Sequence, residues 1–138
     1  MPAVATPIEN YRHTLRVYWE DTDAGGIVFY ANYLKFFERA RTEWLRSLGV
    51  AQQQLKDDTG VMVIVTDTRG SYRSPARLDD ELVVTVTLTA AGRASMVIAQ
   101  QAWCGARLLA EGEIRIGCVD SRNFRPCRIP ESITSKLG

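Results

Sequence analysis

The hydrophobic and polar positions of this chain follow two different periods. From Asn32 onward, apolar residues recur every three or four positions with charged residues between them, as on one face of an α-helix. This face consists of Tyr33, Phe36, Phe37, Ala40, Trp44 and Leu48. The spacing predicts a helix of about four turns that ends near Gly49 and packs its aromatic stripe against a sheet.

Strands are predicted on both sides of this helix. Residues 14–19 alternate loosely between polar and apolar and stop at a turn-rich run, residues 21–26. Four later segments are rich in β-branched or apolar residues: Val61 to Thr68, Leu82 to Thr89, Met96 to Trp103 and Leu108 to Val119. Short connections containing Gly92 and Gly105 join the last three, as in antiparallel hairpins.

This order predicts an α+β fold, with one long helix packed on a five-stranded antiparallel sheet. A sheet covered on one face by one helix leaves its edges open, so a homo-oligomer is expected. The chain of 138 residues fits one domain. We expect residues 1–10, which contain two prolines, to form a flexible leader and residues 11–138 to form the domain. A short helix is expected from Pro130.

Composition narrows the classes of partner and compartment. The formal net charge of +1 gives no global field that would attract nucleic acid or an anionic membrane. No signal peptide and no apolar run long enough to span a bilayer are found, so membrane insertion is not expected. The widely spaced Cys104, Cys118 and Cys127 fit neither a disulfide framework nor a zinc site, which favours a reducing cytoplasm.

Few side chains are available for acid–base chemistry. The single histidine, His13, lies on the first predicted strand, so a Ser-His-Asp set cannot be assembled around the loop that follows. One histidine and scattered cysteines also provide no cluster of metal ligands. Any chemistry must therefore come from carboxylates or backbone amides, and the absence of any catalytic chemistry stays open.

The concentrated polar feature is the loop Glu20 to Gly26. A calcium loop counted from Asp21 fails, because Gly25 and Asn32 occupy its fifth and twelfth positions. A purely structural turn and a catalytic loop both stay open. The catalytic hypothesis rests on Asp23, a carboxylate just before a helix whose free N–H groups, from Tyr30 to Tyr33, carry partial positive charge. Such an arrangement supplies a nucleophile or base and an oxyanion donor to a thioester.

The residues of this region also carry a family resemblance. The run Tyr18 to Tyr33, continued by Phe37 to Arg41, resembles the signature of the 4-hydroxybenzoyl-CoA thioesterase family, and more narrowly its bacterial branch associated with the Tol–Pal envelope system. The likeness extends through residues 72–77 and 118–120. It implies a hot-dog fold, in which the sheet wraps around the helix, and a homodimer that is often doubled to a homotetramer.

The same resemblance implies site residues. It makes Asp23 the catalytic carboxylate, places the oxyanion donor at the backbone N–H of Tyr30, and assigns Gly26 to the close approach of the acyl group. Many members of the Tol–Pal branch carry histidine at the position of Tyr30. A phenol with a pKa of about 10 is a poor base at neutral pH, so the main-chain role is the one expected here.

Further residues are placed near the substrate. Asp21 is expected to brace the loop. Asp21 and Tyr33, at the helix start, are also predicted to bind the substrate. Glu38 and Arg41 fit a surface pair, although Glu38 is also placed near the site. Four arginines are candidates to contact the phosphates of coenzyme A: Arg69, Arg73, Arg77 and Arg93. We single out Arg93, which lies in a predicted hairpin turn.

The sequence therefore predicts hydrolysis of acyl-CoA to a free acid and coenzyme A, with Asp23 as nucleophile or general base. No metal or separate cofactor is expected. A hot-dog dehydratase would need a histidine in the loop, which His13 does not provide. A non-catalytic binder of an acyl carrier protein or an envelope-assembly partner is the alternative, and carrier-protein thioesters are a second substrate class. Acyl chain length is not specified by these patterns.

Overall fold

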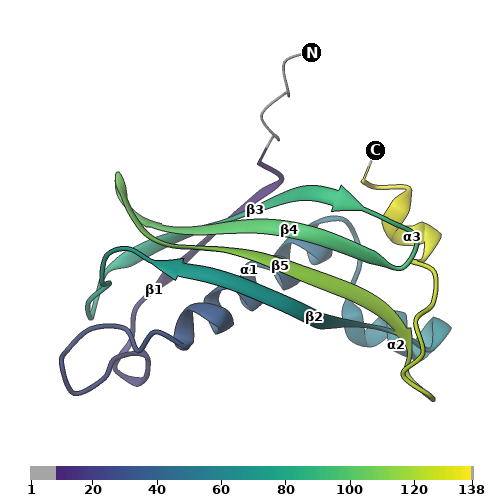
Figure 1. Cartoon of the computed structure of the whole chain (residues 1–138), viewed down its shortest axis with the longest axis horizontal. Coiled ribbons are helices and arrows are strands. Elements are labelled where there is room, and N and C mark those ends of the chain that lie inside the picture. The colour runs from purple at the N-terminus through teal and green to yellow at the C-terminus, as the bar shows by residue number, and fades with distance from the viewer. Residues whose placement is uncertain (1–8, 138) are drawn as a thin grey trace, which may run out of the picture.

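Helix α1 (Asn32–Ser47) is the element around which the rest of the chain is arranged. The structure, a computed structural model, describes residues 9–137. Figure 1 shows α1 running beneath a curved sheet whose concave side faces it. The predicted apolar face is confirmed, since Tyr33, Phe36, Phe37, Ala40 and Trp44 are buried and Leu48 is half-buried. Gly49, with φ of 86°, follows the helix end.

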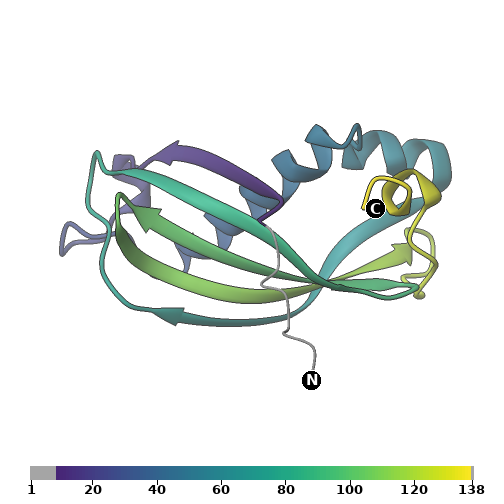
Figure 2. The same cartoon turned by 90° about the horizontal axis from the view of Figure 1, so that it is seen from above.

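The sheet contains five antiparallel strands, as predicted. Its spatial order is β1-β3-β4-β5-β2, so β1 and β2 form the two edges. The strands are β1 (Tyr11–Arg16), β2 (Val61–Tyr72), β3 (Glu81–Ala91), β4 (Ser95–Cys104) and β5 (Arg107–Asp120). Hairpins join β3 to β4 and β4 to β5 through the expected glycine turns. The view from above shows the chain connections gathered at the two ends of the sheet (Figure 2).

Close packing between α1 and the sheet centres on Phe37 and Gly112. A Cβ atom added at Gly112 would lie 3.1 Å from a ring carbon of Phe37 and 3.1 Å from the backbone oxygen of Arg69. Such distances are too short for a side chain to fit without displacing its neighbours. Gly112 therefore allows the helix to lie directly on β5.

Several predicted boundaries were wrong. β1 begins at Tyr11 and ends at Arg16, not at residues 14 and 19, because the chain then turns into a short 3₁₀ helix, η1 (Trp19–Asp21). Helix α2 (Gln52–Thr59) was not predicted, because it buries only Leu55 and so lacks an apolar stripe. β2 continues to Tyr72, four residues beyond the prediction, through polar residues that pair with β5. The short helix α3 (Glu131–Thr134) begins after Pro130, as expected.

The division into leader and domain stays a prediction. Residues 1–8 lie outside the described residues, whereas Asn10 is hydrogen bonded to β3 through its backbone and side chain. In the described part of the chain, no helix is long and apolar enough to cross a membrane.

The first testable consequence concerns Cys118, which β5 places in the core. Burial raises the pKa of this thiol to about 11, and the neighbouring Cys127 adds to the rise. Only about a thousandth of the Cys118 thiols are therefore ionised at pH 8. A thiol reagent at pH 8 should leave Cys118 unmodified in the native protein and modify all three cysteines in denaturant, as counted by mass spectrometry. Rapid modification of native Cys118 would contradict its placement.

Candidate active site

The loop between β1 and α1 is braced by Asp21. Asp21 is buried, and its Oδ2 accepts the backbone N–H of Tyr18 at 2.9 Å. Its backbone oxygen accepts the N–H of Phe29 at 3.0 Å and the side-chain amide of Asn32 at 2.9 Å. One residue therefore ties the start of the loop to the start of α1. This geometry supports the bracing role, and a direct substrate contact by Asp21 stays a prediction.

Asp23 lies at the exposed tip of the same loop. Its backbone N–H donates to the oxygen of Ile27 at 2.9 Å, and its backbone oxygen accepts the N–H of Gly26 at 3.0 Å. The side-chain Oδ1 accepts the N–H of Gly25 at 2.8 Å, which fixes the carboxylate relative to the turn. The other carboxylate oxygen has no hydrogen-bond donor among residues 9–137. It is therefore available to a substrate or a water molecule.

Gly26 has the backbone conformation that its residue type permits. Its φ is 78°, in the left-handed region that side chains disfavour, and no atom lies within 4 Å of the position where a Cβ would be. The loop is therefore turned tightly and left open at Gly26. The close approach of a substrate at Gly26 stays a prediction.

The start of α1 leaves two backbone donors free. Two of the N–H groups that were expected to be free are bonded: Asn32 donates to the oxygen of Phe29 at 2.8 Å and Tyr33 to that of Tyr30 at 3.3 Å. Neither the N–H of Tyr30 nor that of Ala31 has an acceptor within residues 9–137. Ala31 occupies the N-cap position and offers no side-chain cap. Free N–H groups at a helix start carry partial positive charge and attract anions. The predicted oxyanion donor is thus unoccupied.

A hollow of about 260 Å³ adjoins Tyr30. It is lined by Ile27, Val28, Tyr30, Tyr33, Tyr72, Arg73, Ser74 and Pro75. The ring of Tyr72 lies 5.7 Å from that of Tyr30 and 5.6 Å from that of Tyr33, centroid to centroid. Asp23 does not line this hollow, so a single copy of the chain does not enclose Asp23 and Tyr30 in one cavity.

Tyr33 lines the hollow beside Tyr30 and is fixed by a hydrogen bond. Its hydroxyl oxygen accepts the backbone N–H of Ala76 at 3.3 Å. Burial raises the pKa of the Tyr33 phenol above its ordinary value, so the ring stays neutral at physiological pH. Tyr33 therefore holds the segment after β2 against α1.

Arg93 lies at the other end of the molecule from Asp23. It occupies the β3–β4 turn, beside α3, and lines a hollow of about 340 Å³ with Arg128 and Glu131 (Figures 1 and 2). One copy of the chain does not bring Arg93 to the loop of Asp23. Its role in substrate binding stays a prediction.

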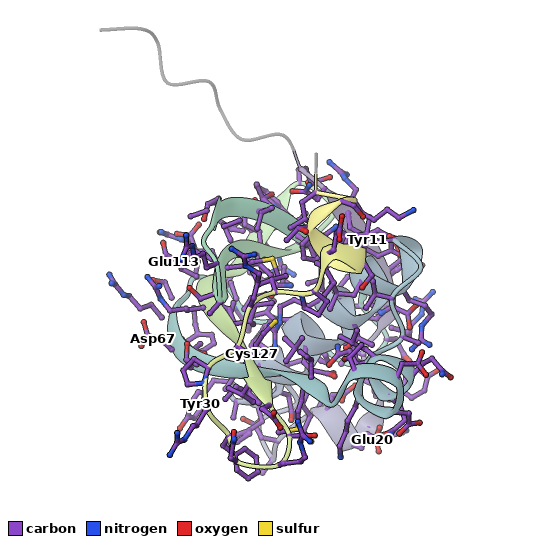
Figure 3. The ribbon with its side chains drawn as sticks, turned by 90° about the vertical axis from the view of Figure 1, so that its right-hand side faces the viewer. Tyr11, Glu20, Tyr30, Asp67, Glu113 and Cys127 are labelled. Atoms are coloured by element: carbon purple, nitrogen blue, oxygen red, sulfur yellow. The ribbon has the colours of Figure 1, made fainter. Side chains whose placement is uncertain are left out.

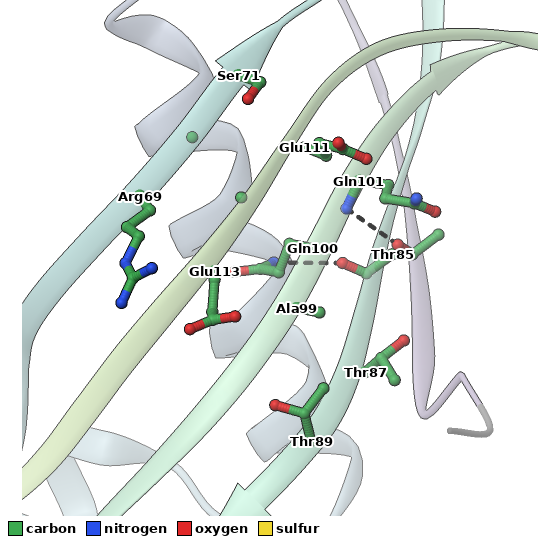
Figure 4. A pocket seen from close by; sticks show the side chains of 12 residues that line it. Arg69, Ser71, Thr85, Thr87, Thr89, Ala99, Gln100, Gln101, Glu111 and Glu113 are labelled. Carbon is green, nitrogen blue, oxygen red and sulfur yellow. Dashed lines mark hydrogen bonds between the residues drawn. The ribbon is translucent and has the colours of Figure 1, made fainter. Parts of the chain in front are cut away.

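The other candidate arginines have varied surroundings. Arg73 forms an ion pair with Glu111, and Arg69 lines a hollow of about 480 Å³. Figure 4 shows that this hollow lies on the face of the sheet opposite α1, among hydroxyl and carboxyl side chains. Asp67 and Glu113 extend outward from the same face (Figure 3). This outer hollow is separated by the sheet from the start of α1.

The interpretation of Glu38 and Arg41 as a surface pair was wrong. Arg41 is 9% exposed, and its Nη1 donates to Oε1 of Gln100 at 2.8 Å. Gln100 is fully buried, and its Nε2 donates to the backbone oxygen of Phe37 at 3.0 Å. Sequence analysis missed Gln100, although its core-facing position between Ile98 and Ala102 in β4 was a signal.

Within residues 9–137, no group of three or more metal-binding side chains comes together. His13 lies half-buried on β1. Asp23 offers one carboxylate oxygen without a hydrogen-bond donor, and Tyr30 and Ala31 offer two N–H groups without an acceptor, among residues 9–137.

Comparison with known families places this loop in context. Residues 17–137 match the model of the thioesterase-like superfamily. The chain belongs to this superfamily. Its match covers the loop, α1 and all strands except β1, so the family predicted from the loop motif is confirmed at the level of the thioesterase-like superfamily.

Individual relatives within the thioesterase-like superfamily cover nearly the whole chain. Acyl-CoA thioester hydrolase YbgC of Escherichia coli O157:H7 is 40% identical over 128 residues, which are 92% of this chain and 95% of that protein. Acyl-CoA thioesterase YbgC of Haemophilus influenzae is 37% identical over 119 residues, covering 86% and 88%. A probable thioesterase from Bartonella henselae, a solved structure, has a TM-score of 0.82 at 28% identity and covers 87% of this chain and 98% of its own.

The bracing role of Asp21 can be tested by Asp21→Ala. The substitution leaves the partly buried N–H of Tyr18 without its acceptor, so the free energy of unfolding should fall by about 1 kcal/mol. Denaturant titration measures this change. Asp67→Ala, at an exposed position of β2, is the control and should change stability by less than about 0.5 kcal/mol. Equal effects of the two substitutions would contradict the bracing role.

Proposed function

We propose that this chain is an enzyme that hydrolyses acyl-CoA thioesters to a free acid and coenzyme A. The observation that carries the proposal is the pair of free N–H groups at Tyr30 and Ala31, next to a loop whose carboxylate Asp23 keeps one oxygen free. The similarity to relatives named acyl-CoA thioesterase and acyl-CoA thioester hydrolase supports the choice of substrate.

The mechanism follows from the charges that develop on the thioester. Its carbonyl oxygen becomes negative in the transition state and is stabilised by the N–H of Tyr30, which already points partial positive charge outward. Asp23 either attacks the carbonyl carbon itself or takes a proton from an attacking water molecule. The C–S bond then breaks and coenzyme A leaves as its thiolate. In the covalent route, water afterwards hydrolyses the anhydride formed with Asp23.

The proposed site is completed by a second copy of the chain. Asp23 is exposed and lines no wall of the hollow beside Tyr30, while the edge strand β2 exposes Val65 at 49% and Tyr72 at 50%. An edge strand with apolar side chains is a natural pairing surface. We therefore place the site at the contact between the two copies of a homodimer. The family resemblance implies that two such dimers associate into a homotetramer.

Coenzyme A phosphates are assigned to the end of the molecule that carries Arg93. Arg93 and Arg128 line one hollow together with Glu131, so its lining carries two positive charges against one negative charge, which favours a phosphate. In an oligomer, this end of one copy can approach the loop of another. The assignment thus depends on the proposed dimer.

The family branch and the cellular compartment of the chain are further parts of the proposal. We assign the chain to the Tol–Pal-associated branch of acyl-CoA thioesterases and to the cytoplasm, which agrees with three free cysteines. Substrates presented on an acyl carrier protein form a second class for the same chemistry, because the thioester and its phosphopantetheine arm are shared.

The catalytic role of Asp23 is tested by Asp23→Asn. Wild-type protein should release thiol from a series of acyl-CoAs, and the variant should lower kcat by at least about 100-fold, because the amide is neither base nor nucleophile. Asp57→Asn on the exposed face of α2 is the control and should retain activity. Circular dichroism checks that both variants fold. Near-normal turnover by Asp23→Asn would refute the assignment, and a wild-type protein that binds but releases no thiol would refute hydrolysis.

The two routes for Asp23 differ in where labelled oxygen goes. During a single turnover in labelled water, only the covalent route transfers the label into the carboxylate of Asp23. Mass spectrometry of the peptide that contains Asp23 therefore separates nucleophile from general base.

The proposed oligomer predicts a mass above that of one chain in light scattering. Val65→Lys places a charge on the exposed edge strand and should shift the protein toward single chains. Thr87→Lys on the outer face of the sheet is the matched control for a dimer formed through the edge. A single-chain mass for the wild-type protein would contradict the proposal.

A further inference from the structure

A second hollow runs between α1 and the edge strand β2, and we call it the α1–β2 hollow. Its volume is about 440 Å³, within the range of small-molecule sites. It is lined by Leu34, Lys35, Glu38, Arg41, Val65, Thr68 and Ile114. A smaller hollow of about 170 Å³ shares Glu38, Arg41 and Val65 with it. The two together extend along one side of the helix.

Arg41 is held rigidly in the wall of this hollow. Its Nη1 donates to Oε1 of Gln100 at 2.8 Å, and the amide of Gln100 donates to backbone oxygens of Phe37 at 3.0 Å and Thr85 at 3.4 Å. Gln100 is therefore fixed by both α1 and β3, and it orients the guanidinium in turn (Figure 4 shows its bond to Thr85). A pre-oriented guanidinium loses little conformational freedom when it binds a ligand.

Arg41 has no acidic partner in the part of the chain that the structure describes. No carboxylate of residues 9–137 forms an ion pair with it, and Glu38 instead accepts the hydroxyl of Thr42 at 3.1 Å. Burial lowers the pKa of Arg41, and the charge of Glu38 only partly opposes this effect. A guanidinium has five N–H donors, and Gln100 accepts a hydrogen bond from only one of them, on Nη1. A buried cation in this state gains most from an anionic ligand.

The other lining residues define the shape of that ligand. Leu34, Val65 and Ile114 provide apolar walls, and Lys35 adds a second positive charge against the single negative charge of Glu38. The hollow therefore suits a molecule that has an apolar body and one negative end. Carboxylate matches the planar fork of arginine.

The hollow begins at Leu34, one turn after Tyr30 with its free N–H. Leu34, Glu38 and Arg41 are spaced by four and three residues, so they lie on the same side of α1. Arg41 is about 14 Å along the axis from Asn32, where the helix begins just after Tyr30, and helical side chains lean toward the N-terminus, which shortens the gap. An extended chain of moderate length spans it.

We infer that the α1–β2 hollow is a carboxylate site, in which Arg41 binds the negative end of a short apolar chain. The carboxylate has two sources. It is the distal group of a dicarboxylic acyl chain whose thioester lies at Tyr30, a case that rests on the proposed function, or it is the carboxylate of a free acid. The shared chemistry is recognition by Arg41.

Direct binding tests the site without any turnover. Octanoate and octanedioate are titrated calorimetrically into the wild-type protein and into Arg41→Met, with octanol as the neutral probe. We expect at least about tenfold weaker binding of the acids by the variant and unchanged binding of octanol. Arg39→Met, at an exposed position of the same helix, is the matched control and should bind like wild type.

Turnover distinguishes the two sources. If the distal carboxylate is recognised, kcat/KM for octanedioyl-CoA relative to octanoyl-CoA should fall about tenfold in Arg41→Met and stay constant in Arg39→Met. If only the free acid is recognised, that ratio stays constant while octanoate binding depends on Arg41. A wild-type protein that hydrolyses neither thioester but binds octanoate through Arg41 would remove the proposed function and leave the carboxylate site standing.

A second variant covers the case that Arg41→Met fails to fold. Leu34→Trp enlarges a side chain in the wall that is 45% exposed, leaves the Arg41–Gln100 bond in place, and should abolish binding of octanoate. Acid binding that is unaffected by either variant overturns the inference. Arg41→Met that leaves acid binding intact but changes the mass in light scattering also overturns it, since a second copy would then occupy the hollow.

Discussion

The burial of α1 against the concave side of the sheet is the interaction on which the rest of the structure depends. Its aromatic face fills the core, and Phe37 can approach β5 only because Gly112 has no side chain. At the centre of this contact, Gln100 bonds to the backbone of both α1 and β3, so the helix has a fixed position along the strands. The loop of Asp23 and the free N–H groups at the helix start are placed by that same contact.

Much of the fold was predictable, because its signals are local. The three-to-four residue spacing of aromatics predicts α1, and alternation with glycine turns predicts the hairpins from β3 to β5. α2 was missed since seven of its eight residues stay outside the core and give no periodic pattern. The end of β1 was misplaced, because the hydrogen bonds of η1 compete with the strand and no composition signal marks where they begin.

In the candidate site, too, the local features were predictable from the sequence and the long-range contacts were not. The turn of Asp23 and Gly26 is made by bonds between near neighbours in the sequence, so residue types alone indicated it. The surroundings of Arg41 were not predictable, because its partner Gln100 is 59 residues away and the pairing exists only once the helix lies on the sheet. A glutamate three positions earlier suggested a surface ion pair, and tertiary packing prevailed over that local pattern.

The order of the strands has a consequence for how the chain folds as it is synthesised. Tyr11 in β1 pairs with Val86, and Val61 in β2 pairs with Asp120. Both edge strands are therefore synthesised well before the strands with which they pair. The apolar face of α1 leaves the ribosome before any of the three central strands exists to cover it. A nascent chain in this state exposes Phe36, Phe37 and Trp44, which makes the middle of translation the moment of greatest need for a chaperone.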